Sequence, residues 1–244
     1  MSDSEEDSKE RHLKLVVLGE QNVGKTNLVK KYCHDEFSRI YVPTIGADFY
    51  VKRISLARNK NIIVRITDVS GSECTGHMLG TYLFKANIVI LLYDLTNKES
   101  FDSLTAWLTK IDQILRYSDD ENRHVSIVIV GNKCDLEHKK MIRPDEAKHF
   151  AHENKLYSYV MSAKTGENVN FSFADMVARY LNLRLNSLDM DKQNPILEAE
   201  IIPYTPPTVQ YRRKFSSKKA KDQNMKKTAL KSRGSSLSQT CAIQ

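Results

Sequence analysis

Eight residues near the start of the chain, Gly19–Thr26 (GEQNVGKT), limit its possible folds more than any other segment, because they satisfy G-x-x-x-x-G-K-[ST]. The apolar run Leu13–Leu18 before them predicts a buried strand, and Thr26–Tyr32 begins a helical pattern after them. A strand, a glycine loop and a helix start in this order let backbone N–H groups wrap a phosphate chain. A chance glycine loop is the alternative. We expect Lys25 to reach the outer phosphates and the Thr26 hydroxyl to ligate Mg²⁺.

A second motif indicates which nucleotide the chain binds. Asn132–Asp135 (NKCD) follows the apolar run Val125–Val130, so it lies at the carboxyl end of a predicted strand, where open α/β sheets bind ligands. The Asp135 carboxylate can accept two parallel hydrogen bonds, and guanine offers N1–H and its N2 amine as a matching pair. Adenine lacks this pair, so ATP would leave the carboxylate buried and unpaired. Alone, the motif fits a surface turn equally well; after a phosphate loop it indicates a guanine nucleotide.

A third motif, Ser162–Lys164 (SAK), follows the apolar run Leu156–Met161. Its Ala163 N–H could donate to the guanine carbonyl. In the same corner, Asn132 would tie the base-binding loop to the phosphate loop, and the stem of Lys133 would cover the face of the base. An ATP-using phosphotransferase on the same fold is an alternative, and Asp135 argues against it.

With these motifs the chain resembles the Ras superfamily of small GTPases. Asp68–Gly71 (DVSG) is similar to that family's DxxG, and Thr44 matches its switch-one threonine. The resemblance implies that Thr44 ligates Mg²⁺, that Asp68 holds the ion through water, and that the Gly71 N–H senses the γ-phosphate. Phe37 falls where the family stacks an aromatic ring on the purine, with core filling as the alternative role. The implied nucleotide-binding residues are Gln21, Asn22, Val23, Gly24, Lys25, Thr26, Phe37, Tyr41, Thr44, Gly71, Asn132, Lys133, Asp135, Ser162, Ala163 and Lys164, with Thr26, Thr44 and Asp68 at Mg²⁺.

Within the superfamily the chain resembles the Rab type. Ile45–Phe49 (IGADF) looks like the Rab signature IGVDF, and Leu91–Thr96 (LLYDLT) looks like another Rab motif. The chain ends in Cys241–Gln244 (CAIQ), a CaaX box whose final Gln favours farnesyl on Cys241, as in one divergent Rab branch. The resemblance implies a GTP-binding switch in vesicle and membrane traffic, of the endocytic or cilium-linked kind. Its implied partners are GTP-dependent effectors, a nucleotide exchange factor and a prenyl-binding carrier.

The catalytic machinery departs from the family pattern. After DxxG the family usually has Gln-Glu, and this chain has Ser72-Glu73. That Gln orients the attacking water, and a serine side chain is too short to span the same gap. Gln21 stands where the family usually has its second loop glycine, so its side chain would project toward the γ-phosphate and crowd the water-positioning residue and any arginine finger from an activating partner. Asn22 beside it replaces another small residue, and Asn tolerates left-handed backbone.

These departures predict that GTP or GDP and Mg²⁺ still bind while hydrolysis is slow, with Ser72, Lys25 and Gly71 at the catalytic positions. Substitution of the missing Gln by Glu73 or His77 is an alternative, and so is normal switching with compensating changes elsewhere. A further alternative is a GTP-bound adaptor with almost no hydrolysis, which nucleotide exchange or membrane release would reset.

One partner-binding feature also differs. Thr67 occupies the place of the Trp that precedes DxxG in most Rabs, where it would form an aromatic patch with Phe49 and Tyr82. Effector identity therefore does not carry over from other Rabs.

The order of patterns predicts an α/β fold, a P-loop GTPase domain over residues 12–184. An acidic N-terminus, residues 1–11, precedes it, and a basic tail, residues 185–244, follows it. Apolar runs alternate with helical patterns, which predicts a six-stranded, mainly parallel sheet with helices on both faces. A turn at 58–61 predicts one antiparallel hairpin. The predicted strands are 13–18, 48–56, 62–66, 88–93, 125–130 and 156–161, and the predicted helices are 27–32, 79–85, 100–116, 144–153 and 168–183.

The tail predicts membrane contact. The chain carries a formal charge of +7, and residues 205–244 hold ten Lys or Arg against one Asp. One lipid chain anchors only marginally, so a basic run beside an anionic leaflet would supply the second signal. A nucleic-acid-binding tail is the alternative, which the CaaX box disfavours. We expect a disordered tail, no nucleic-acid partner, and a lipid-anchored protein at the cytoplasmic face of the plasma membrane or an endomembrane, with the cilium base as one candidate, and a cytosolic pool.

Composition sets two further limits. The four cysteines Cys33, Cys74, Cys134 and Cys241 show no metal-binding spacing and no disulfide framework. The longest apolar run, Ile88–Tyr93, is far shorter than the ~20 residues of a spanning helix. Membrane contact is therefore expected at the C-terminus.

Overall fold

Six strands form one sheet in the order β2-β3-β1-β4-β5-β6. The structure is a computed structural model that describes residues 10–56, 60–74, 77–116 and 124–183. Its strands are β1 (Arg11–Leu18), β2 (Ala47–Leu56), β3 (Lys60–Val69), β4 (Ile88–Asp94), β5 (Ser126–Asn132) and β6 (Tyr157–Val160). Its helices are α1 (Lys25–His34), α2 (Leu79–Leu83), α3 (Lys98–Asp102), α4 (Leu104–Arg116), α5 (Pro144–Glu153) and α6 (Val169–Tyr180), with 3₁₀ turns η2 (Gly71–Cys74) and η3 (Glu137–Lys139).

The sheet is parallel except at one edge, as the sequence predicts. β1 pairs in parallel with β3 and β4, and β5 pairs in parallel with β4 and β6. β2 runs antiparallel to β3 along its whole length, from Ala47 opposite Val69 to Leu56 opposite Lys60. The carboxyl ends of β1, β3, β4 and β5 therefore meet at one edge of the sheet, where the sequence motifs follow these strands.

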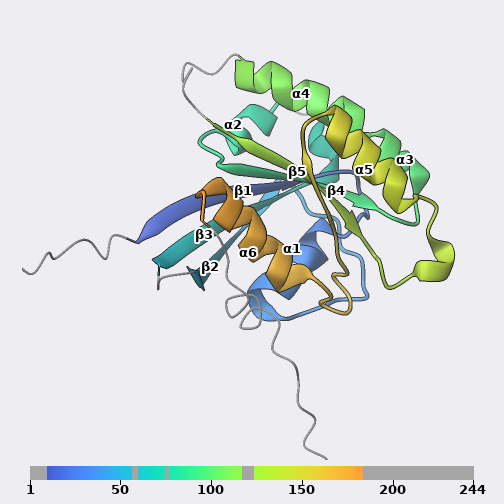
Figure 1. Ribbon diagram of the computed structural model, residues 1–244, viewed down its shortest axis with the longest axis horizontal. Coiled ribbons are helices and arrows are strands. Elements are labelled where there is room, and N and C mark those ends of the chain that lie inside the picture. The colour runs from blue at the N-terminus through green and yellow to red at the C-terminus, as the bar shows by residue number, and fades with distance from the viewer. Residues whose placement is uncertain (1–9, 57–59, 75–76, 117–123, 184–244) are drawn as a thin grey trace, which may run out of the picture. The chain divides into compact units, whose positions relative to one another are not determined.

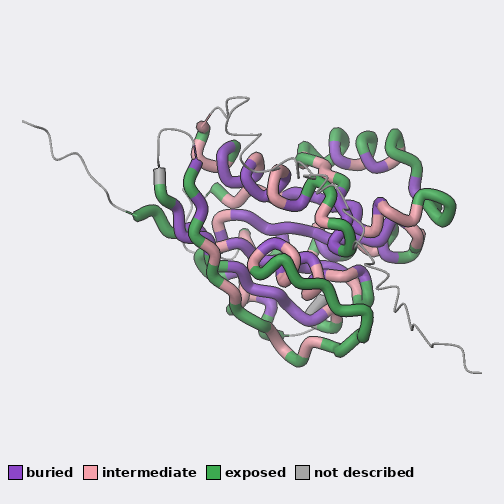
Figure 2. Tube along the Cα trace, turned by 90° about the horizontal axis from the view of Figure 1, so that it is seen from below, coloured by how far each residue is buried: buried purple, intermediate pink, exposed green. Residues whose placement is uncertain are grey.

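Each face of the sheet carries its own apolar core. On one face α1 and α6 pack against the strands, with the rings of Tyr32 and Phe173 stacked at 3.9 Å between their centroids. On the other face α2, α3, α4 and α5 cover the strands, and the fully buried Trp107 of α4 lies in this core (Figure 1). Helix α4 is buried along one side, at Leu104, Trp107 and Ile111, whereas β4 is buried at every position, as expected for a central parallel strand (Figure 2).

Most predicted elements differ from the structure only at their ends, and two differences need a physical explanation. The single predicted helix 100–116 is divided into α3 and α4 at Ser103, whose hydroxyl donates to the Ser100 carbonyl at 2.9 Å. A side chain that bonds the local backbone competes with the helical pattern, which sequence periodicity does not register. The strand predicted at 62–66 extends over Lys60–Val69, because β2 pairs with β3 along this whole stretch. This extension places Asp68 at the site edge of the sheet.

The predicted domain ends and the basic tail fall mostly on residues outside the described ranges, so they stay predictions. Among the described residues, no helix is long and apolar enough to cross a membrane.

Candidate guanine-nucleotide site

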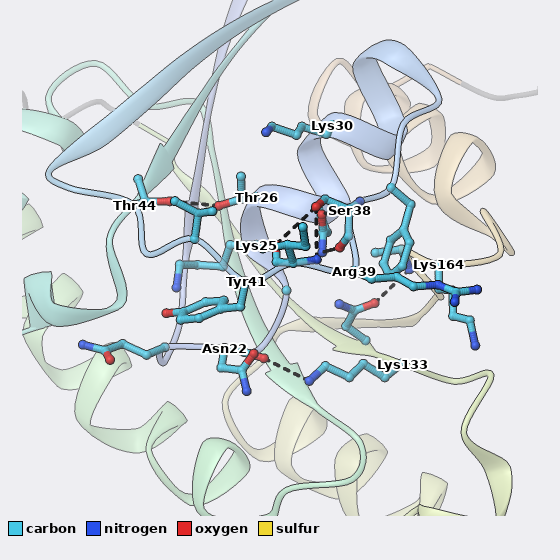
Figure 3. A pocket seen from close by; sticks show the side chains of 18 of the residues that line it. Asn22, Lys25, Thr26, Lys30, Ser38, Arg39, Tyr41, Thr44, Lys133 and Lys164 are labelled. Carbon is cyan, nitrogen blue, oxygen red and sulfur yellow. Dashed lines mark hydrogen bonds between the residues drawn. The ribbon is translucent and has the colours of Figure 1, made fainter.

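A cavity of about 370 Å³ opens at the carboxyl edge of the sheet. Residues from four separate parts of the chain line it: the phosphate loop and α1, the segment 37–44, Ser70 and Gly71, and the loops after β5 and β6. Figure 3 shows their side chains gathered around one space. Of the predicted nucleotide-binding residues, Val23 and Ser162 do not line the cavity and instead support residues that do.

The phosphate loop adopts the backbone that its sequence requires. Gly24 has φ +96 and a Cβ there would meet the Asn132 side chain at 2.4 Å, so this position needs glycine. Asn22 has φ 61, in the left-handed region that Asn tolerates. Lys25 Nζ donates to the carbonyls of Gly19 at 2.9 Å and Glu20 at 2.7 Å. Burial lowers the pKa of Lys25 to about 8, with Asp68 and Glu20 acting in the opposite direction.

Three oxygen-bearing side chains meet beside the phosphate loop. Thr26 Oγ1 lies 2.5 Å from Asp68 Oδ2 and 2.9 Å from Thr44 Oγ1. Asp68 Oδ1 is buried without a hydrogen-bond partner, and burial raises the pKa of this carboxyl to about 6. An orphaned carboxylate oxygen beside two hydroxyls fits Mg²⁺, which takes one or two carboxylates and fills its shell with phosphates and water. Thr26, Thr44 and Asp68 are thus placed together as the sequence predicts.

The described residues offer no other metal site of the usual kind. Within them, no group of three or more His, Cys, Asp or Glu side chains could hold a metal ion. A site with a single carboxylate depends on ligands from the nucleotide, so Mg²⁺ and nucleotide would bind together.

The base-binding corner is a chain of buried hydrogen bonds. Asn132 is 1% exposed and its Nδ2 donates to the Val23 carbonyl at 2.8 Å, which ties this corner to the phosphate loop as expected. Ser162 Oγ donates to Asp135 Oδ1 at 2.7 Å and so fixes the carboxylate that would read guanine. The Ala163 N–H donates to Asn132 Oδ1 at 3.0 Å. If the Ala163 N–H donates to the guanine carbonyl as predicted, it must either bond both acceptors or give up the bond to Asn132.

Lys133 connects three parts of the site. Its Nζ donates to the Asn22 carbonyl at 2.9 Å and lies 2.6 Å from Asp94 Oδ2. Asp94 ends β4 directly opposite Asn132 of β5, so strand register places this carboxylate beside the base-binding loop. Sequence reasoning did not identify Asp94 as a site residue. Its position at the carboxyl end of a buried strand could have indicated that it lies at the site.

The segment 37–44 forms the outer wall of the cavity. Phe37 and Tyr41 line it, and Phe37 is 38% exposed, which is incompatible with the alternative role of core filling. Asn27 of α1 holds this wall at Ser38: its Nδ2 donates to the Ser38 carbonyl at 2.9 Å, and its Oδ1 accepts the Ser38 N–H at 3.2 Å. Sequence reasoning missed this contact also, because nothing local to Asn27 indicates what lies opposite.

The two catalytic departures occupy different positions. Gln21 lines the cavity and is exposed, whereas Ser72 is not among the lining residues. The Ser72 hydroxyl lies 3.0 Å from the Ser70 hydroxyl. Gly71 packs closely on the phosphate loop, and a Cβ on it would meet the Gln21 nitrogen at 2.5 Å.

These features define a class: an α/β protein with a phosphate loop, an oxygen cluster beside it that fits Mg²⁺, and a partly buried carboxylate, Asp135, at the other end of the cavity. Comparison with known proteins agrees, since the model described as Ras family matches residues 14–182. Ras-related protein Rab-28 of Caenorhabditis elegans is 32% identical over 82% of this chain and 80% of its own length. Rab-3 of the same organism is 35% identical over 74% of this chain and 79% of its length, and Rab-3C of Bos taurus 33% over 85% and 89%.

The chain belongs to the Ras family, and within it to the Rab group of small GTPases. Its cofactors are therefore GTP or GDP and Mg²⁺. The predicted likeness to a divergent Rab branch is confirmed by the similarity to Rab-28, and the predicted fold is confirmed as well.

Proposed function

We propose that this chain is a GTP-binding switch in membrane traffic whose own hydrolysis of GTP is slow. The observation that carries the proposal is the position of Ser72, the counterpart of the water-orienting Gln, outside the cavity wall. Its hydroxyl bonds Ser70, two residues away, instead of reaching toward the nucleotide. A serine side chain in this place is too short to replace the Gln amide that holds a water against the γ-phosphate.

Gln21 adds to the effect of Ser72. Its side chain lies at the cavity edge, where the family usually has glycine. Gly71 leaves no room for a Cβ between itself and the Gln21 backbone, so the two loops are in direct contact. An arginine supplied by an activating partner would have to enter beside this amide, and such a finger is worth roughly 10³–10⁵ in rate.

The remaining residues suit tight nucleotide binding. Lys25 and the loop N–H groups hold the phosphates, and Asp135, oriented by Ser162, selects guanine. Mg²⁺, held by Thr26, Thr44 and Asp68, would neutralise phosphate charge when bound. The groups that bind the nucleotide are in place, but the group that orients the attacking water is missing. This combination favours a switch that stays in its GTP-bound state for a long time.

Single-turnover GTP hydrolysis tests this proposal. We expect the Gln21→Gly, Ser72→Gln double variant to hydrolyse bound GTP about tenfold or more faster than the native chain, because positioning dominates this reaction. The matched control is Ser72→Ala, which removes the hydroxyl without adding an amide and should be as slow as the native chain. Equal rates for the double variant and the native chain, both at an ordinary small-GTPase level, would show that another residue positions the water.

The outcome also separates the two switch readings. If the native chain hydrolyses GTP at a measurable rate and the double variant is faster, the protein is a switch with slow hydrolysis. A native rate indistinguishable from free GTP in buffer supports the alternative of a GTP-bound adaptor that exchange or membrane release resets. Either result is compatible with effectors that recognise the GTP state and with a dedicated exchange factor.

We further propose that farnesylated Cys241 and the basic tail anchor the protein to an anionic membrane, with a prenyl-binding carrier for its cytosolic pool. The support is the CaaX ending together with ten basic residues in 205–244. Vesicles with and without phosphatidylserine test this on full-length farnesylated protein. Cys241→Ser should abolish binding, and neutral vesicles should bind weakly; equal binding to both vesicle types would refute the electrostatic contribution.

A further inference from the structure

The beginning of the phosphate loop is bonded to a helix that is distant in sequence. Trp107 of α4 donates its indole N–H, at Nε1, to Glu20 Oε1 at 3.1 Å. Trp107 is the only tryptophan of the chain and is fully buried, whereas Glu20 is partly buried. A buried indole N–H needs an acceptor, and a carboxylate accepts a stronger bond than a neutral oxygen does. The bond therefore fixes Glu20 to the helix layer that contains α4 (Figure 1).

Two other contacts meet at the peptide that joins Glu20 to Gln21. Lys25 Nζ donates to the Glu20 carbonyl at 2.7 Å. The backbone of Gly71 packs directly on this peptide, since a Cβ on Gly71 would lie 2.5 Å from the Gln21 nitrogen and 2.7 Å from the Glu20 carbonyl carbon. Helix α4 also contacts η2, which begins at Gly71. Three elements, α1, η2 and α4, thus determine together where this peptide lies.

The bond from Trp107 differs from the bond from Lys25 in its relation to the nucleotide. We expect Lys25 to reach the outer phosphates of a bound nucleotide, and its Nζ would then leave the Glu20 carbonyl. The Trp107 bond joins two side chains and involves neither Lys25 nor a phosphate group, so it can persist when the nucleotide is bound. It is therefore suited to hold Glu20 while Lys25 is engaged elsewhere.

We propose that Trp107 is a positioning residue of the nucleotide site. By holding Glu20, it keeps the Glu20–Gln21 peptide where Gly71 can approach the γ-phosphate, and it thereby contributes to the preference for GTP over GDP. The resemblance assigns the Gly71 N–H to the γ-phosphate, and the close packing of Gly71 on the peptide makes the two move together. This role concerns nucleotide binding, so it does not depend on how fast the chain hydrolyses GTP.

A positioning role and a merely structural role have different consequences when the bond is lost. A structural contact would lower the melting temperature or weaken the binding of GTP and GDP alike. Loss of positioning weakens GTP binding selectively, because GDP has no γ-phosphate for Gly71 to contact. Two substitutions at the partly buried Glu20 separate these cases. Glu20→Ala removes the acceptor, whereas Glu20→Gln keeps an acceptor oxygen at nearly the same reach and removes the charge.

Dissociation constants for GDP and for a slowly hydrolysed GTP analogue, measured on the full chain with Mg²⁺, test the proposal. We expect Glu20→Ala to weaken binding of the analogue relative to GDP about three- to tenfold, since one hydrogen bond to the loop is lost. Glu20→Gln should retain most of the native ratio. Tyr159→Phe is the matched control, because it removes a hydroxyl that donates to Asp175 Oδ2 at 2.8 Å, between β6 and α6, and it should leave the ratio unchanged.

Trp107 itself provides a direct readout of the bond. With one tryptophan in the chain, a ¹H–¹⁵N spectrum contains a single indole cross-peak. Its proton should move upfield in Glu20→Ala, where the acceptor is lost, and stay near its native position in Tyr159→Phe. Trp107→Phe keeps a ring without the N–H and should change the ratio of dissociation constants as Glu20→Ala does. Combining these two substitutions should change the ratio no further than either does alone.

Three results would overturn the proposal. The first is a Glu20→Ala variant with the native ratio of dissociation constants, whatever its melting temperature. The second is an indole cross-peak that does not move in Glu20→Ala. The third is a Glu20→Gln variant as impaired as Glu20→Ala, which would make the charge of Glu20, and not its bond to Trp107, responsible. If Trp107→Phe does not fold, the two Glu20 variants and the cross-peak decide.

Discussion

The two ends of the nucleotide cavity are built on different principles. At the base end, Asn132 bonds Val23 and Ala163, Ser162 bonds Asp135, and Asn132 and Ser162 are almost completely buried. At the γ-phosphate end the wall consists of loops, in which Ile40, Val42 and Ile45 are 78%, 71% and 95% exposed. Gln21 and Ser72 belong to this second, open end.

The difference teaches where sequence change is tolerated. A buried network loses stability when one member is removed, because its partners stay unsatisfied. A residue in an exposed loop can change the rate of a reaction while the fold and the affinity persist. The departures from the family pattern lie at the open end, whereas the base-reading residues match the family. Substitutions at each end test this contrast.

The largest effect is expected at the base end, from Asp135→Asn. The carboxylate would lose two charge-assisted hydrogen bonds to guanine, so the affinity for GDP should fall roughly 10²–10³-fold. Xanthosine diphosphate, whose C2 carbonyl can accept from an Asn amide, should bind the variant better than GDP does. Titration with fluorescent nucleotides measures both, and the exposed Asp112→Asn serves as control. Unchanged affinity of the Asp135→Asn variant for GDP would contradict the role of Asp135 in binding guanine.

Most of the base end could be predicted from the sequence. Motifs that follow parallel strands converge because the carboxyl ends of those strands share one edge, so the contact of Asn132 with the phosphate loop followed from position alone. Phe37 and Thr44 were placed by resemblance, and the structure brings both to the cavity. The order of strands and their directions followed from the alternation of patterns with one turn between two strands.

Contacts between distant elements could not be predicted. Trp107 Nε1 donates to Glu20 Oε1 at 3.1 Å and joins α4 to the phosphate loop, across 87 residues of sequence. Asp94 beside Lys133 depends on the pairing of β4 with β5. To predict such contacts, one must know which helix covers which face of the sheet. The periodicity of a single sequence shows only that an element has an apolar face. The division at Ser103 was missed because the apolar periodicity continues across it, and periodicity does not register the Ser103 hydroxyl bond to the Ser100 carbonyl.

A smaller effect is expected from Gly71→Ala, where η2 contacts the phosphate loop. An added Cβ would lie 2.5 Å from the Gln21 nitrogen and 2.7 Å from the Glu20 carbonyl carbon, so η2 would have to shift away from the phosphate loop. Binding of GTP, for which the resemblance assigns the Gly71 N–H to the γ-phosphate, should weaken about tenfold, while binding of GDP stays nearly unchanged. The ratio of the two dissociation constants reports this shift.

Gly80→Ala is the control for that ratio. A Cβ on Gly80 would meet only Ile114 Cγ2 at 3.8 Å, an ordinary contact, and Gly80 lies in α2 of the same region. A ratio altered equally by both variants would mean that general loosening of this region, and not the Gly71 contact, sets the preference for GTP.

The smallest effect is expected from Asn27→Ala, which tests whether the outer wall belongs with the rigid end or the open end of the cavity. The substitution removes both hydrogen bonds to Ser38 in an exposed setting, where each contributes about 1 kcal/mol or less. Phe37 and Tyr41 would then be held less firmly, and GDP dissociation should accelerate about three- to tenfold. The rate of single-turnover hydrolysis should not change, since the Asn27 side chain bonds the Ser38 backbone and Asn27 is remote from Ser72 in sequence.

Asn154→Ala is the matched control, because Asn154 also donates to a backbone carbonyl, that of Phe150, but lies at the end of α5. If GDP dissociates faster from the Asn27→Ala variant but not from the Asn154→Ala variant, the outer wall helps to retain the nucleotide. Slower hydrolysis with unchanged release would instead assign it to the catalytic end. In that case residues 37–44 and Ser72 would act together on the γ-phosphate, and the contrast between a rigid base end and an open phosphate end would have to be redrawn at Asn27.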